Sequence, residues 1–477
     1  MRPTSSAVAT TFVAVLVAAV TATLAAPAST LAAGPPSAPR QDTLTLMGAL
    51  RRALEVDPTL RAAAAGVDRA GSELDAARAS RLPWLTTHAS AVRFEEPMVV
   101  APIHGFDIMT PPDFDRTLVQ GGLSLAYTVW DGGARGARID RAVAMDDVAH
   151  ADTTATLQMT IERAVAAYLA VLTARDVLEA QRLRMDALEA ERSRVARFLE
   201  EGAAARLELL RARAELSAGR ADEAAAEARL ELAEADLARL LDVPREDVRR
   251  ASLRDVAPGG DRVPPAAAPA GDQHPAGGST DPEMDREVDT HPAVRAALAR
   301  VQAAAAGTRE ARAAWFPRVV ASGRLSEWGG GSTDFSTEWQ GGVAVELPLF
   351  TGGARRAGAE ASRAHLNAAD ANLDATRRQV HMAADRALAA EREAAARALA
   401  LEEAVTQFEE LARVEALALR EGVGVQRDWL QAQAGLVRAR AGLAEASRGV
   451  ILARVRLARA LGTLTLDRID QDLEDVS

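Results

Sequence analysis

Few side chains in this chain combine residue type and spacing in a way that supports chemistry. Asp147, His150 and Asp152 have the carboxylate and imidazole groups of a metal site, but in a long charged helical stretch such residues usually form a solvated face. The chain has no Lys and no Cys, which excludes a Walker loop, a disulfide, a thiolate metal site and a cysteine nucleophile. No nucleophile elbow or zinc-protease helix occurs. The sequence therefore predicts no catalytic residues, no cofactor and no resident metal.

The composition indicates long helices rather than an ordinary globular core. Of 477 residues only 4% are aromatic, and Ala, Leu, Arg and Glu are abundant. These residues favour helix and allow helix backbones to pack closely. The net charge is −11, with the acidic residues interspersed among arginines. This pattern argues against a nucleic-acid-binding surface.

The chain contains two copies of one unit. Three groups of residues return 220 positions later, as from Gln120 to Gln340: Gln120-Gly121-Gly122 with Gln340-Gly341-Gly342, Trp130–Arg135 with Phe350–Arg355, and Glu201-Gly202 with Glu421-Gly422. The offset is still the same at Leu241 and Leu461. A repeat held in one register restricts the fold to structures that use the unit twice.

Each copy begins with a helix followed by a β-hairpin. Pro58 and Pro292 suit the first helical position, and the helices stop before Pro83 and Pro317, 25 residues later in both copies. The length of each is about 37 Å. Pro83 and Pro317 therefore mark helix-to-strand junctions. Four strand-like segments follow, the last three with clear apolar–polar alternation: Trp84–Phe94, Val119–Trp130, Val319–Trp328 and Trp339–Phe350.

Glycine pairs return the strands to helix. Gly132-Gly133 and Gly352-Gly353 are expected to form the strand-to-helix turns, with positive φ or tight packing as the reason for glycine. The helices that follow run without proline to Gly202 and Gly422, about 100 Å each.

The helix lengths predict how each copy packs. A third helix of about 55 Å runs to Leu241 and to Leu461. The first and third helices together measure about 93 Å, close to the length of the long helix. We therefore expect one continuous helix beside two shorter helices placed end to end, with a hairpin turn at one end and the strands at the other.

Two β-hairpins per chain do not form a closed structure by themselves. Their alternation fits a barrel with lipid outside and water inside, and strands of roughly 10–13 residues have the right length to cross a bilayer at a tilt. Open strand edges do not persist in lipid, so closure requires several chains. The expected fold class is mainly α with a transmembrane β-barrel portion, built from two tandem repeats of helix, β-hairpin, long helix and helix.

The remaining segments complete the domain organisation. Arg2, the apolar run after it and a small-residue site at Ala26–Ala28 predict a cleaved signal peptide, with an uncleaved anchor as the alternative. Residues 257–283 are rich in Pro, Gly and Ala and are expected to be flexible or extended. The full assignment is signal peptide 1–28, leader 29–42, first repeat 43–243, linker 244–287, second repeat 288–465 and tail 466–477.

The start of the first repeat carries a family pattern: Leu44–Leu46, Ala49-Leu50, Ala53-Leu54 and Asp57–Arg61. With the glycine-pair junctions and the duplicated order of elements, the chain resembles the outer-membrane factor (TolC-like outer membrane efflux protein) family over residues 43–465. The resemblance implies a homotrimer with a twelve-stranded barrel in the outer membrane of a Gram-negative bacterium and an α-helical tunnel in the periplasm. It also implies passive export, with outer-membrane lipid, a periplasmic adaptor (membrane fusion protein) and an inner-membrane transporter as partners.

The resemblance also implies where the adaptor docks. Gly202 and Gly422 match the tip glycines of the periplasmic hairpins, and Glu208 and Asp428 match the acidic residues that follow them. The alternative is a plain hairpin turn followed by an ordinary acidic residue at a helix start. The side chains that constrict the mouth in family members are replaced, although Asp428 repeated by symmetry would still form an acidic ring. The replaced positions carry Leu419, Gly424 and Gln431.

Together with these patterns, the resemblance implies the outer-membrane channel of a tripartite efflux or type I secretion system. A periplasmic coiled-coil adaptor or scaffold without a barrel is the alternative hypothesis. It is disfavoured because the two alternating hairpins lie symmetrically between helices. A helical peptidoglycan-acting enzyme is a third hypothesis, for which no catalytic constellation is visible.

Overall fold

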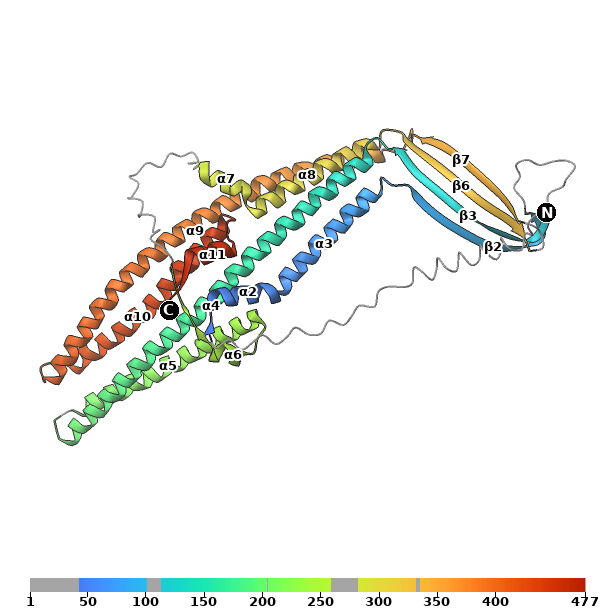
Figure 1. Ribbon diagram of the computed structural model, residues 1–477. Helices are drawn as coiled ribbons and strands as arrows, with labels where there is room; N and C mark the ends of the chain where they lie inside the picture. Colours follow the sequence, from blue (N-terminus) through green and yellow to red (C-terminus); the bar gives the residue numbers. More distant parts are fainter. Residues whose placement is uncertain (1–42, 101–112, 204, 259–281, 332–334, 477) are drawn as a thin grey trace. The chain divides into compact units, whose positions relative to one another are not determined.

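The computed structural model describes residues 43–100, 113–203, 205–258, 282–331 and 335–476. The predicted signal peptide, the leader and most of the Pro-rich stretch lie outside these residues. The described chain divides into two compact units (Figure 1). Unit 1 contains Ser72–Val143 and Ala303–Leu366, and unit 2 contains the remaining described residues.

A four-stranded antiparallel sheet dominates unit 1. The strands lie in the order β2-β3-β6-β7 (Figure 1), so the central pair joins the hairpin of the first repeat to that of the second. The outer strands, β2 and β7, each have one edge without a partner strand in the described chain. The bounds are Trp84–Val99 for β2, Phe114–Trp130 for β3, Arg318–Gly330 for β6 and Ser336–Glu346 for β7.

The register of the sheet separates an apolar face from a polar one. Leu123 pairs with Leu325, which in turn pairs with Trp339, and these three exposed side chains share one face. The adjacent row, Ser124 with Arg324, lies on the opposite face. The predicted alternation is therefore confirmed in β3, β6 and β7.

Several predicted strand boundaries are wrong; β3, for example, begins at Phe114 rather than at the expected Val119. The last strand was expected to reach Phe350, but β7 ends at Glu346. Pro348 lacks the N–H that a strand ladder needs, which explains the early end. At the other hairpin, β2 continues beyond the expected Phe94, with a register irregularity between Arg93 and Met98.

The helices follow the predicted duplicated order. The long helices α4 and α9 have 67 residues each, and α3 and α8 have 22 each. An additional short helix, α2, precedes α3 and is capped by the Thr45 hydroxyl. The bounds are Leu46–Val56 for α2, Pro58–Ala79 for α3, Ala134–Glu200 for α4, Arg206–Leu241 for α5, Pro292–Ala313 for α8, Ala354–Arg420 for α9 and Gln426–Ala460 for α10.

Within unit 2 each long helix packs against its two shorter partners, as expected. Arg182 and Arg184 of α4 pair with Glu227 and Asp222 of α5 at 3.2 and 2.8 Å, in antiparallel order. Thr153 of α4 donates a hydrogen bond to a carbonyl of α3. In the second repeat, ion pairs join α9 to α10, and a small apolar cluster joins α9 to α8.

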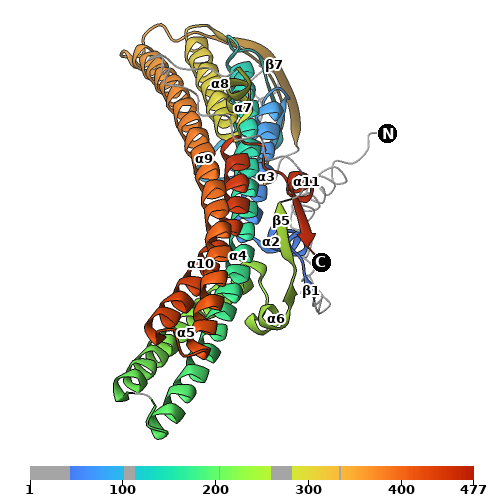
Figure 2. The ribbon, with the colours of Figure 1, turned by 90° about the vertical axis from the view of Figure 1, so that its left-hand side faces the viewer.

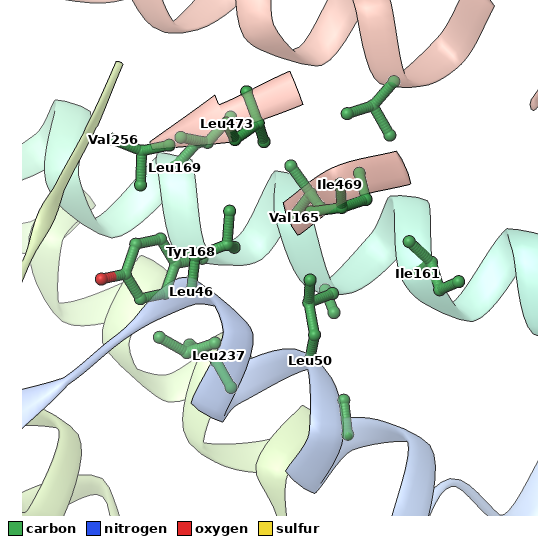
Figure 3. Close-up of a cluster of buried hydrophobic side chains, with 14 of the residues drawn as sticks. Leu46, Leu50, Ile161, Val165, Tyr168, Leu169, Leu237, Val256, Ile469 and Leu473 are labelled. Atoms are coloured by element: carbon green, nitrogen blue, oxygen red, sulfur yellow. The ribbon is translucent and has the colours of Figure 1, made fainter. Parts of the chain in front are cut away.

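The main hydrophobic core of unit 2 gathers small elements around α4 (Figures 2 and 3). Tyr168 is buried there, and its hydroxyl lies 2.9 and 2.8 Å from the carbonyl oxygens of Leu44 and Arg254. Those carbonyls flank the parallel pairing of β1 with β4. The small elements are β1 (Thr43–Leu44), α6 (Arg245–Arg250), β4 (Ser252–Leu253), β5 (Asp255–Pro258), α11 (Leu466–Asp472) and β8 (Leu473–Val476), besides α7 (Pro282–Thr290) before α8.

The expected linker 244–287 and tail 466–477 are therefore partly built into the fold. Strand β5 pairs with β8, and Val256, Ile469 and Leu473 enter the core around Tyr168 (Figure 3). Their apolar side chains are isolated in polar sequence, so no local periodicity identifies them. Their partners lie far away along the chain.

Candidate functional site

The two hairpin tips of unit 2 are built on glycines in the left-handed conformation. Gly202 and Gly422 have φ of +73° and +74°. Gly202 donates to the carbonyl of Leu199, and the next residue, Ala203, donates to that of Phe198; Gly422 and Val423 repeat this pattern. This is the Schellman arrangement, which terminates a helix and favours glycine because it carries no Cβ.

Acidic residues begin the return helices at both tips. The backbone N–H of Glu208 bonds to Ala205 and that of Asp428 to Val425, which places both carboxylates in a first helical turn, where the helix dipole favours negative charge. Asp428 is exposed and Glu208 is half-buried. The structure thus places the four predicted tip residues at two equivalent turns; their role in docking remains a prediction.

A buried polar cluster just behind the tips was not predicted. Glu191 of α4 is 5% exposed and Gln426 of α10 is 8% exposed. The Glu191 carboxylate accepts two hydrogen bonds of 2.8 Å from Arg194 and one of 3.0 Å from Gln426 Nε2. This last bond joins the hairpin of the first repeat to that of the second. Its partners are separated by 235 positions, so no sequence pattern identifies it.

Glu208 contributes to the electrostatics of this cluster. The hydrogen bond from Arg194 to Glu191 raises the pKa of the guanidinium, and the nearby charge of Glu208 raises it further, while burial opposes the shift. Arg194 therefore keeps its charge at any physiological pH. One of the predicted docking residues is consequently tied to the cluster that joins the hairpins.

Apolar side chains surround the tip turns. Val423 is 81% exposed, and Val425, Leu207 and Leu210 are also largely exposed. Position 424 has room only for glycine, because a Cβ there would lie 2.7 Å from the backbone nitrogen of Leu419. The tips therefore carry an exposed apolar surface beside turns that require glycine.

The strand-to-helix junctions of unit 1 are also built on left-handed glycines. Between β3 and α4, Gly132 and Gly133 have φ of +66° and +90°; between β7 and α9, Gly352 and Gly353 have φ of +59° and +86°. Asp131 caps the first junction by accepting hydrogen bonds from the N–H and the guanidinium of Arg135.

The opposite junctions are marked by the predicted prolines. Pro83 directly precedes β2 and Pro317 directly precedes β6, after helices that end at Ala79 and Ala313. A groove of about 1130 Å³ lies beside these junctions and carries side chains of both charges, including Arg135, Arg138, Glu310, Arg318, Glu346 and Arg355.

The first helices of the two repeats are capped differently. Asp57 accepts hydrogen bonds from Thr59 and Thr160; burial raises its pKa, but these hydrogen bonds outweigh burial and leave the pKa below its usual value. At the equivalent position of the second repeat, Nδ1 of His291 accepts from the N–H of Ala293. Burial lowers the pKa of His291, so the neutral ring is favoured.

The candidate metal triplet does not converge. His150 Nε2 lies 3.8 Å from Asp146 rather than against either predicted partner, and Asp152 pairs with Arg300 at 3.0 Å. Within the described ranges, no three His, Asp or Glu side chains are grouped as metal ligands would be.

None of the helices in the described part of the chain is both long enough and apolar enough to cross a bilayer.

Solved outer-membrane protein structures share the fold of this chain. The outer membrane protein VceC from Vibrio cholerae gives a TM-score of 0.72 at 20% identity, over 87% of this chain and 96% of that one. The CmeC outer membrane channel of Campylobacter jejuni gives 0.73 at 16% identity, over 89% and 88%. These likenesses show the fold, which combines long helices with an antiparallel β-sheet.

Sequence comparison gives the family. Protein CyaE from Bordetella pertussis is 31% identical over 365 residues, which cover 74% of this chain and 70% of that protein. Residues 49–242 and 285–463 match the family described as outer membrane efflux protein, one match for each repeat. The chain belongs to the outer membrane efflux protein family.

Proposed function

We propose that three copies of this chain form a passive export channel, the outer-membrane duct of a tripartite efflux or type I secretion system. The sheet of unit 1 carries this proposal. It joins the hairpins of both repeats, exposes an apolar face and leaves one open edge on β2 and one on β7. Pairing β7 of one copy with β2 of the next removes every edge, as lipid requires.

The number of copies is supported by the family. The resemblance implies a trimer, and four strands from each of three chains supply a twelve-stranded barrel. The similarity to Protein CyaE and to the solved outer-membrane channels agrees with an export duct. The alternative of a periplasmic adaptor without a barrel has no observation in its favour.

The hairpin tips are proposed as the surface for a periplasmic adaptor, which connects the duct to an inner-membrane transporter that supplies the energy. The exposed Val423, Val425, Leu207 and Leu210 support this role, because exposed apolar groups beside rigid turns favour docking of a partner. Outward movement of the two hairpins is the proposed opening step.

Cell fractionation and gel electrophoresis test the channel. We expect the protein in the outer-membrane fraction, and a detergent-extracted sample run without boiling should migrate as a trimer that boiling converts to a monomer. A soluble periplasmic monomer would contradict the proposal.

Substitution of Gly422 tests the docking role. Proline has a fixed negative φ and cannot adopt the φ of +74° found here, so Gly422→Pro should abolish export while the trimer still assembles. Gly422→Asn is the matched control, because Asn tolerates this conformation and should retain export. Normal export by the proline variant would refute a role for this tip.

A further inference from the structure

The second repeat contains a contact that has no counterpart in the first. In unit 2, Gln158 of α4 is 3% exposed and donates a 2.7 Å hydrogen bond to the carbonyl of Gly462, at the end of α10. One turn further along α4, Glu162 pairs with Arg456 at 3.1 Å and with Arg459. Helix α4 of the first repeat thus packs beside the C-terminal end of α10 in the second repeat.

The equivalent space beside the first repeat is open. The residues 220 positions before Gly462, Arg459 and Arg456 are Asp242, Arg239 and Asp236. These residues line a groove of about 510 Å³ at the end of α5. Asp242 and Asp236 are exposed, and no segment of the described chain occupies the position that α4 takes in the second repeat.

Helix α9 carries the equivalents of the α4 residues on an open face. Gln158 corresponds to Arg378, and Glu162 corresponds to Met382. Arg378 is exposed and makes no ion pair among the residues that the structure describes, and Met382 is 48% exposed. The same helix face is therefore covered on α4 and uncovered on α9.

The residues equivalent to the Gln158–Gly462 pair carry opposite charges, Arg378 on α9 and Asp242 at the groove. The other charged residues that line the groove are Asp57, Asp236, Arg61, Arg163 and Arg239, so the attraction is specific to Asp242. Asp242 is also the one non-glycine with positive φ in the described part of the chain, at +50°, where Gly462 has +74°. A carboxylate thus occupies a turn whose backbone favours glycine.

In unit 1, the strand-to-helix junctions also form a contact in one repeat that is left open at the equivalent position of the other. A Cβ on Gly132 would lie 2.8 Å from the Cβ of Phe316, whereas a Cβ on Gly352, its equivalent, meets nothing within 4 Å. The counterpart of Phe316 in the first repeat is Leu82, which precedes Pro83 and is 68% exposed. Again the contact is made within the chain on one side and left open on the other.

We propose that α9 of one copy docks into the Asp242 groove of a second copy, with Arg378 paired to Asp242 and Met382 packed beside it. Such a contact joins different surfaces of identical chains, so it is propagated around a ring. It rests on the proposed oligomeric channel and names the residues that hold the copies together.

The attraction is local to this groove. Asp140 and Arg309 pair within unit 1 at 2.7 Å. Their equivalents are both acidic: Glu360, 220 positions after Asp140, and Asp75, which lies 234 positions before Arg309, the offset that relates Pro83 to Pro317. Each already pairs with an arginine of its own helix. These positions contribute no attraction between copies, and Asp236 is likewise paired with Arg239 of its own helix at 3.0 Å. The test is therefore placed at Asp242 and Arg378.

Cysteine cross-linking in native membranes tests the contact, because the chain has no cysteine of its own. In the double variant Asp242→Cys with Arg378→Cys, a short bismaleimide should give covalent dimers and trimers on denaturing gels. Either single variant should stay monomeric. Asp242→Cys with Arg397→Cys, displaced along α9 by about 28 Å, is the matched negative control. Glu162→Cys with Arg459→Cys is the positive control and should cross-link within one chain.

The outcomes separate this inference from the channel itself. A trimer on unboiled gels without cross-linked species in the Asp242–Arg378 variant overturns the contact and leaves the channel proposal standing. Absence of any trimer overturns both.

Charge reversal gives a second readout. Arg378→Glu should lower the trimer fraction at least tenfold, and adding Asp242→Arg should restore it. Asp242→Asn, which keeps the left-handed turn, replaces the arginine variant if that variant does not fold. An unchanged trimer fraction in Arg378→Glu would refute the pairing.

Discussion

The bond between Gln426 and Glu191 gives the most quantitative prediction for the hairpin tips. Replacing Gln426 by Leu keeps a side chain of similar size and removes the 3.0 Å hydrogen bond to the carboxylate. Both residues are buried, so water does not replace the bond. Glu191 keeps its two bonds to Arg194, so no uncompensated charge is created. The cost is that of a hydrogen bond to a charged group, about 1.5–3 kcal/mol.

This cost should appear as local opening of the first turns of α10. Because about 1.4 kcal/mol corresponds to a tenfold change in an equilibrium constant, amide protection there should fall about 10- to 100-fold. Hydrogen exchange of the detergent-extracted protein, followed by mass spectrometry, measures this directly. Glu191→Ala should have a larger effect, because Arg194 then loses its partner as well.

The matched control lies in the same helix. Gln431 is exposed and makes no side-chain hydrogen bond in the described structure, so Gln431→Leu should leave protection unchanged. Equal protection in Gln426→Leu and Gln431→Leu would refute the conclusion that this bond holds the two hairpins together.

Three further predictions concern pH, charge and the core. The pKa of His291 is lowered from 6.5, so the unfolded chain takes up the proton first as pH falls. The stability contributed by neutral His291 is complete above about pH 6.5 and is lost as pH falls through the pKa of His291 in the folded chain. His291→Asp introduces the capping residue type of the first repeat. Thermal melts between pH 7 and pH 5 should show that this variant no longer loses that stability. Asp428→Asn should reduce cation preference in single-channel conductance without changing trimer assembly, and unchanged selectivity would exclude an acidic ring. Tyr168→Phe should cost about 1 kcal/mol, seen as faster hydrogen exchange in β1 and β4, and unchanged exchange would show that its hydroxyl does not hold that pair.

The repeated architecture could be predicted because its signals are local or strictly periodic. The glycines at Gly202 and Gly422 mark turns that need positive φ, and Pro83 and Pro317 mark the starts of strands. The long helices follow from an uninterrupted run of helix-forming residues. The glycines and prolines of the tips and junctions were found in this way, since each suits the conformation of its own backbone, whereas Glu208 and Asp428 were assigned from the family resemblance.

The tertiary structure decided the features that depend on distant partners. Helix α11 and strand β8 follow no repeat and are ordered by the core around Tyr168. The Glu191–Gln426 bond joins residues of different repeats, and its polar types look like an ordinary solvated helix face in the sequence. The sequence by itself determined two copies of one unit and the turns that shape them. Only the folded chain decided which equivalent surfaces are covered and which stay open, because burial depends on what packs against a residue and not on its type.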